Sequence, residues 1–93
     1  MKLTDRFAVS EDVVAREVGG ETVLLDLNSG QYFGLDAVGG RIWELLSDAP
    51  RNLSELCDQI ECEFDAPRDR IEADLVALAT QLRDQELILA EAA

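Results

Sequence analysis

The chain has 93 residues, with 20 acidic side chains, eight basic ones and no histidine, and its formal net charge is −12. A chain of this length buries one small core and has little room for a separate active-site layer. The negative charge argues against a nucleic-acid partner, because phosphates bind basic side chains. Without histidine, the usual general base and the commonest metal ligand are both missing.

The first third of the chain has the alternating pattern of β-strands. The pattern predicts three strands, at about residues 12–18, 21–27 and 31–35. Gly19 and Gly20 permit the positive φ angles of a tight hairpin turn, and Gly30 provides a left-handed position in the second turn. We therefore expect an antiparallel three-stranded meander.

Successive side chains of a strand point to opposite faces of the sheet. In the second strand this alternation produces one wholly apolar face, which we expect to pack on the helices: Val23, Leu25 and Leu27. In the third strand we expect Phe33 and Leu35 in the core and Tyr32 at the surface or in a groove.

From residue 36 onward the apolar residues recur at helical spacing and predict three helices. The first begins after the N-cap Asp36 and ends near Ser47. Asn52 and Glu55 form a capping box at the start of the second, and Pro67 lies in the first turn of the third. The expected buried stripe of the third helix consists of Ile71, Leu75, Leu78, Ala79 and Leu82. We expect residues 87–89 to close the core as a short extended segment.

Two glycines and two cysteines need separate explanations. Gly39 and Gly40 each cost roughly 1 kcal/mol inside a helix relative to alanine, and we attribute them to close packing of the helix start on the sheet rather than to a phosphate-binding loop. Cys57 falls in the apolar stripe of the second helix and Cys62 on its exposed side, so the sequence predicts neither a disulfide nor a metal site. We expect no catalytic residue and no cofactor.

A small sheet with three helices indicates an α+β, winged helix-turn-helix-like fold, in which a three-stranded antiparallel sheet is followed by three helices. DNA-binding members place the third helix in the major groove. Here that helix carries Asp69, Glu72 and Asp74, which would face phosphates, so a DNA-binding winged-helix regulator is the weaker alternative. An acyl carrier protein is disfavoured, because none of the serines has the required Asp-Ser-Leu context.

The stretch from Val23 to Leu46, VLLDLNSGQYFGLDAVGGRIWELL, resembles the PqqD-like family. Its members are stand-alone recognition elements for ribosomally made, post-translationally modified peptides. The similarity covers about residues 12–89. Asp36 replaces the usual asparagine, and Gln85-Glu86-Leu87 stands where the family commonly has a glycine before leucine.

The resemblance implies a non-catalytic chaperone that binds the leader segment of a precursor peptide. In the family the leader adds as a strand to the open edge of the third strand and lies in a groove against the third helix, which is strand augmentation. The residues agree independently, because strand 31–35 has neither the charge nor the proline that protects an exposed edge. The expected peptide-binding residues are Gln31, Tyr32, Phe33, Gly34, Leu35, Asp69, Glu72, Asp74, Leu75 and Val76.

The resemblance also implies the partners. Besides the precursor peptide, we expect a processing enzyme, namely the leader protease of a lasso-peptide pathway; the alternative is a radical S-adenosylmethionine enzyme in PQQ-type or other peptide maturation. No apolar segment indicates a signal peptide or a membrane span, so we expect a cytoplasmic protein without a nucleic-acid or membrane partner. We expect a single domain over residues 1–93, with 1–10 and 90–93 as candidate loose tails.

Overall fold

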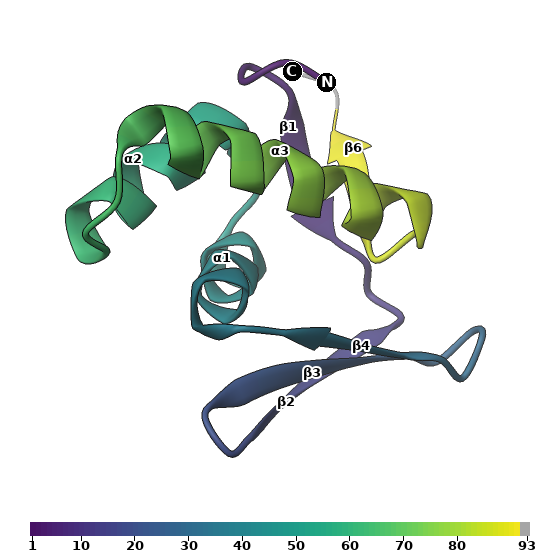
Figure 1. Cartoon of the computed structure of the whole chain (residues 1–93). Coiled ribbons are helices and arrows are strands. Elements are labelled where there is room, and N and C mark those ends of the chain that lie inside the picture. The colour runs from purple at the N-terminus through teal and green to yellow at the C-terminus, as the bar shows by residue number, and fades with distance from the viewer. Residues whose placement is uncertain (92–93) are drawn as a thin grey trace.

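The computed structural model describes residues 1–91 (Figure 1). The elements are β1 (Arg6–Val9), β2 (Val13–Val18), β3 (Glu21–Asp26), β4 (Tyr32–Leu35), α1 (Ala37–Asp48), β5 (Arg51–Asn52), α2 (Leu53–Glu63), α3 (Arg68–Asp84) and β6 (Ile88–Glu91). The strands form two antiparallel sheets, β2–β3–β4 and β5–β1–β6. The α+β class, the meander and the three helices are confirmed, whereas the second sheet was not predicted.

The turns of the meander are the ones that its glycines indicated. Gly19 and Gly20 have φ angles of 60° and 87°, and Gly30 has a φ of 75°. Positive φ at both central residues matches the twist of the flanking strands. The glycines therefore predicted correctly the two turns that connect β2, β3 and β4.

The segment before the meander, which belongs to the predicted loose tail 1–10, is ordered in part as β1. This strand pairs with both β5 and β6, and the Phe7 side chain is buried in the core. On β6, Ile88 is buried next to the buried Leu87, so these two residues close the core as expected, whereas Leu89 is exposed. Residues 92–93 of the other predicted tail, 90–93, lie outside the described residues.

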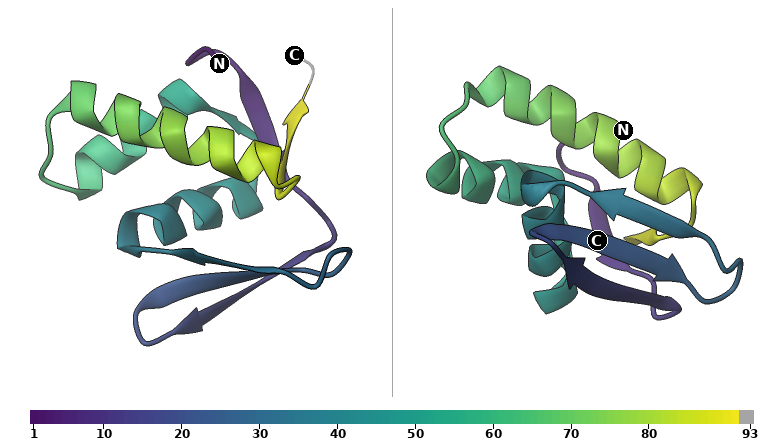
Figure 2. Two further views of the ribbon diagram at one scale, coloured as in Figure 1. Left: turned by 45° about the vertical axis from the view of Figure 1, so that its right-hand side comes forward. Right: turned by 60° about the horizontal axis from the view of Figure 1, so that its bottom comes forward.

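The prediction for the faces of β3 is wrong. The side chain that enters the core is Leu24, which is 0% exposed, whereas Leu27 is 59% exposed. The inner face is selected by α1, which lies against it (Figure 2): a Cβ added to Gly40 would approach Thr22 Oγ1 to 2.5 Å. The close helix–sheet packing inferred from the two glycines is thus observed at Gly40.

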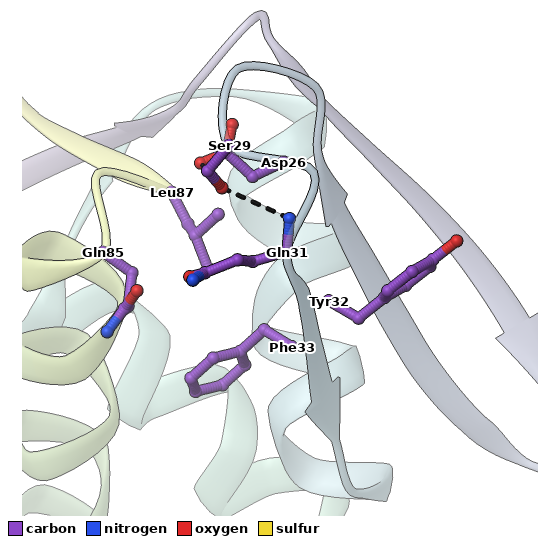
Figure 3. Close-up of a pocket in the computed structure, with 7 residues that line it drawn as sticks. All are labelled: Asp26, Ser29, Gln31, Tyr32, Phe33, Gln85 and Leu87. Carbon is purple, nitrogen blue, oxygen red and sulfur yellow. Dashed lines mark hydrogen bonds between the residues drawn. The ribbon is translucent and has the colours of Figure 1, made fainter.

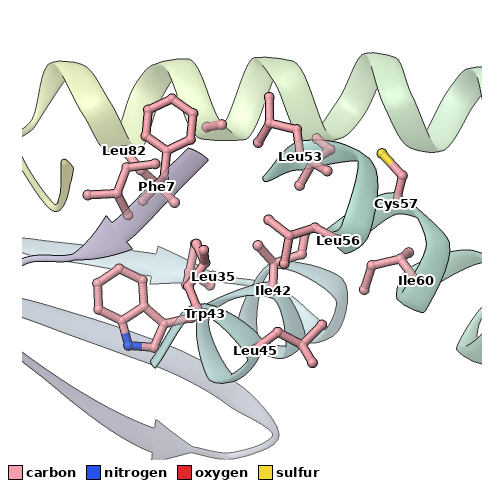
Figure 4. Packing of buried hydrophobic residues seen from close by; sticks show 14 of the residues in the cluster. Phe7, Leu35, Ile42, Trp43, Leu45, Leu53, Leu56, Cys57, Ile60 and Leu82 are labelled. Atoms are coloured by element: carbon pink, nitrogen blue, oxygen red, sulfur yellow. The ribbon is translucent and has the colours of Figure 1, made fainter. Parts of the chain in front are cut away.

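The core lies between α1, α2, α3 and the inner faces of the two sheets (Figure 4). At the start of α1, Asp36 Oδ1 accepts a hydrogen bond from the Gly39 N–H at 2.8 Å. At the start of α2, Asn52 and Glu55 form the predicted capping box. Cys57 is buried and Cys62 is exposed, both as free thiols, and burial raises the pKa of the Cys57 thiol.

The helix α3 has the expected buried stripe except at Leu78, which is only half-buried. Pro67 precedes the helix as its N-cap rather than lying in its first turn. At the other end, Glu86 has a φ of 60°, and the Leu87 N–H donates to the Leu82 carbonyl at 2.8 Å. Glu86 therefore occupies the left-handed position of a Schellman motif, which usually holds glycine.

Candidate functional site

The open edge of the β2–β3–β4 sheet at β4 lies opposite α3 (Figures 1 and 2). This strand consists of Tyr32, Phe33, Gly34 and Leu35 and has no charged residue or proline. Such an edge presents unpaired main-chain N–H and C=O groups that can pair with another strand.

The pairing with β3 decides which main-chain groups of β4 are free. Next to the ladder, the Asp26 N–H donates to the Gln31 carbonyl at 2.9 Å, so Gln31 directs its carbonyl toward β3. In an antiparallel ladder, hydrogen-bonded and non-bonded pairs alternate. With Phe33 opposite Leu24, Phe33 and Leu35 bond to β3, and Tyr32 and Gly34 direct their N–H and C=O groups to the open edge.

The side chains of β4 separate in the predicted way. Phe33 and Gln31 point toward α3, and Tyr32 points to the opposite side (Figure 3). Tyr32 is 72% exposed, Leu35 is buried and Phe33 is half-buried against the core. A strand added beside β4 would therefore find Phe33 and the flank of α3 on one side.

One flank of α3 faces this edge. The α3 residues that border two hollows of the surface show which flank it is. A small hollow of about 20 Å³ lies between Gln85, at the C-cap of α3, and Phe33 and Gln31 of the β4 segment (Figure 3). A second hollow of about 80 Å³ lies where α1 follows β4 and is bordered by Arg70 and Asp74 of α3.

Helical geometry connects the two hollows. At about 100° per residue, the positions that share a flank with Asp74 are Arg70, Leu78, Gln81 and Gln85. Together with the open edge of β4, these five residues define what we call the β4–α3 groove. Leu78 provides its half-buried apolar surface.

The second hollow combines an apolar interior with a charged mouth. Its walls are mostly apolar and come from all three helices and the connection between α2 and α3: Val38, Ile42, Ile60, Phe64, Ala66, Ile71 and Leu75. Arg70 Nε and Asp74 Oδ2 are 3.6 Å apart, and both side chains are about three-quarters exposed. An ion pair this exposed stabilises the fold by no more than about 1 kcal/mol, so both charges remain available to a ligand.

The structure does not bring all the predicted site residues to this groove. Glu72 lies on the far flank of α3, where Arg68 Nε donates to its carboxylate at 2.8 Å. Arg68 Nη1 pairs in addition with Asp58 of α2 at 2.6 Å. Val76 and Asp69 share that flank by helical geometry. Leu75 belongs to the buried core and reaches only the wall of the 80 Å³ hollow.

The residues of the groove that sequence reasoning missed are Arg70, Leu78, Gln81 and Gln85, and it also missed Val38 in the wall of the 80 Å³ hollow. The missing information was the rotation of α3 relative to the sheet. The far flank turns toward the N-terminus, since Thr80 Oγ1 lies 4.0 Å from Met1 Sδ. Leu78 carried a usable signal, because it was the apolar residue of the stripe closest to Asp74 around the helix.

Two further properties concern the described part of the chain, residues 1–91. It contains no group of three or more His, Cys, Asp or Glu side chains placed to hold a metal ion. Its helices are all too short or too polar to cross a membrane.

Two solved structures are similar to this chain. A structure described as TbiB1 in complex with the TbiA(beta) leader peptide is similar to the chain, with 40% identity and a TM-score of 0.81 over 92% of this chain and 99% of that one. A lasso peptide synthetase B1 complexed with the leader peptide has 25% identity and a TM-score of 0.77, over 89% and 96% of the two chains. No curated protein matches the chain.

The family profile described as Coenzyme PQQ synthesis protein D (PqqD) matches residues 21–88, which hold β3, β4 and all three helices. The same stretch carries the edge of β4 and the α3 flank that define the groove. The chain belongs to the PqqD family.

Proposed function

We propose that this chain binds the leader segment of a ribosomally made precursor peptide and delivers it to the enzyme that removes the leader in a lasso-peptide pathway. The observation that carries the proposal is the open edge of β4, where Tyr32 and Gly34 each direct a main-chain N–H and C=O toward a groove bordered by α3. Two structurally similar proteins are each described in complex with a leader peptide, which supports a leader peptide as the ligand of this chain.

In this proposal the leader adds as a fourth strand beside β4. Main-chain hydrogen bonds to Tyr32 and Gly34 provide affinity, and alternate leader side chains provide selectivity. Those that point into the groove contact Phe33 and Leu78 and reach the 80 Å³ hollow. Asp74, at the mouth of that hollow, is placed to pair with a basic leader residue.

The proposed role needs no chemistry from this chain. Its contribution is to hold the leader so that the attached peptide meets the active site of another protein, which raises the effective concentration of the substrate there. We place this step in the cytoplasm, where ribosomal precursors are made.

One alternative is delivery to a radical S-adenosylmethionine enzyme in PQQ-type maturation; the family description, which names coenzyme PQQ synthesis, supports that kind of pathway. The leader-binding step is the same in both cases, and only the enzyme differs. Duplex DNA is a poor candidate ligand, because the net charge is −12 and DNA binding requires basic contacts to phosphates.

The test uses a fluorescein-labelled synthetic leader of the precursor encoded with this chain, with the remaining core segment as the control peptide. We expect the leader to raise fluorescence anisotropy on titration with the chain and the core segment to leave it unchanged. Mass spectrometry of the precursor, incubated with the cognate protease with and without this chain, then measures delivery. Equal anisotropy curves for the two peptides would refute leader recognition, and unchanged cleavage would favour the alternative enzyme.

A further inference from the structure

The second surface of interest is the face of the β2–β3–β4 sheet that points away from the helices. Its side chains alternate outward along the three strands and surround a hollow of about 270 Å³: Val14, Arg16, Val18, Val23, Leu25 and Tyr32. We call these six residues the outer face. No segment of residues 1–91 covers it (Figure 2, right).

The composition of the outer face is unusual for a solvated surface. An antiparallel sheet with one face in water normally places polar side chains there. Here Val14 is 48% exposed, Val18 is 57% exposed and Tyr32 is 72% exposed. A contiguous apolar patch of this kind indicates a surface that binds another protein.

Arg16 adds a specific chemical requirement. It lies opposite Val23, between Val14 and Val18 along β2, and thus midway along the edge strand that borders the outer face. Among residues 1–91, its guanidinium makes no ion pair. A protein that covers this face buries the guanidinium and must supply a carboxylate or carbonyl oxygens to it, because a buried unpaired charge is strongly unfavourable.

We propose that the outer face docks the leader-processing enzyme, through an apolar surface of that enzyme that places an acidic side chain opposite Arg16. This inference rests on the proposed function, since it names the surface through which the bound leader is delivered. The outer face is one side of a twisted sheet, and another sheet or a helix of the enzyme can pack on it.

Continuity with the leader site favours the enzyme as the occupant. Tyr32 belongs to both surfaces, because its main chain lies on the open edge of β4 and its side chain lies on the outer face. A leader strand added beside Tyr32 places every second side chain on that same face. An enzyme seated there contacts the chain and the leader together, next to the peptide that it processes.

Charge disfavours a second copy of the chain. Each copy carries a net charge of −12, and two such molecules repel each other. An enzyme surface of neutral or positive net charge has no such penalty.

The test separates docking from leader binding with the double variant Val14→Thr/Val18→Thr. Threonine keeps the β-branched shape that suits a strand, and both positions are exposed, so the fold is preserved. We expect the leader affinity to stay within about twofold of the parent. We expect the enzyme to bind the variant at least about tenfold more weakly, because docking would bury hydroxyls without partners.

Two further variants sharpen the result. Arg16→Glu reverses the charge on β2, and we expect it to weaken docking at least as much as the double variant while leaving leader affinity unchanged. The matched control is Leu89→Thr, which changes an equally exposed apolar strand residue (54% exposed) on the other sheet and should affect neither measurement. The measurements are leader anisotropy and biolayer interferometry of the purified cognate protease on the immobilised chain–leader complex.

Each remaining outcome has one meaning. Enzyme affinity equal to the parent's in both outer-face variants would overturn the docking surface while leaving leader binding intact. Light scattering that shows a dimer of the parent, lost in the Val14→Thr/Val18→Thr variant, would assign the face to a second copy instead. A parent chain that does not bind the leader would overturn the proposed function itself. The leader anisotropy titration detects this outcome without the enzyme.

Discussion

Replacing Gly34 by proline removes one main-chain donor from the open edge of β4 and leaves the β3–β4 ladder intact. The Gly34 N–H points away from β3, as the register and the Asp26–Gln31 hydrogen bond require. Proline is tolerated on edge strands when its nitrogen faces solvent. We therefore expect a folded protein with impaired leader binding.

The size of the effect follows from the lost main-chain bond. A hydrogen bond contributes about 0.5–1.5 kcal/mol net, and a partner left unsatisfied on burial costs about 1–3 kcal/mol. The proline ring also occupies space next to the leader strand. The expected loss of about 1–3 kcal/mol corresponds to a leader affinity that is roughly five- to 150-fold weaker.

The matched control is Gly34→Ala, which retains the N–H. A Cβ at residue 34 has no atom within 4 Å, so this variant should bind the leader nearly as the parent does. The opposite control is Phe33→Pro, which removes a donor that points at β3 and truncates a half-buried ring. We expect its free energy of unfolding to fall by about 3 kcal/mol or more. This is a large part of the free energy of unfolding of about 5–15 kcal/mol that is typical of proteins.

The assay combines circular dichroism, urea denaturation and leader anisotropy for the three variants. If folded Gly34→Pro bound the leader as tightly as Gly34→Ala, strand addition at this edge would be excluded. If Phe33→Pro were folded and Gly34→Pro unfolded, the assigned register of β4 would be wrong.

Three further predictions concern stability. Glu86→Gly should raise it by about 1 kcal/mol, because the residue has a left-handed φ of 60° that glycine adopts without a Cβ clash; an unchanged urea midpoint would count against a strained helix end. Gly40→Ala should lower it by about 1–3 kcal/mol through overpacking against Thr22, and Thr22→Ala should partly restore it in the double variant; full stability of the single variant would disprove close packing. Hydrogen bonds from Arg41 lower the pKa of Glu63 below its ordinary 4.5. The stabilisation from these bonds is complete above pH 4.5 and is lost as the pH falls through the lowered pKa. The thermal midpoint of Glu63→Gln should therefore depend less on pH across that acidic range than the midpoint of the parent chain.

The sequence by itself determined the local structure. The glycines of both β-turns, the Asp36 cap of α1 and the Asn52–Glu55 capping box of α2 each act within a few residues, so their chemistry is readable from the chain alone. The open edge of β4 was readable in the same way, because residues 31–35 lack the charges that protect an edge.

The tertiary structure decided what depends on the relative placement of elements. It decided which face of β3 is buried, because Leu24 shares that face with its cross-strand partner Phe33 and with Leu35 of β4, and α1 packs against it at Gly40. It also decided which flank of α3 borders the groove, because Asp74 and Glu72 are equally polar in sequence and differ only in the rotation of the helix. Lastly, it assigned the outward N–H groups of β4 to Tyr32 and Gly34, since alternation defines two sets of residues and only the pairing with β3 selects between them.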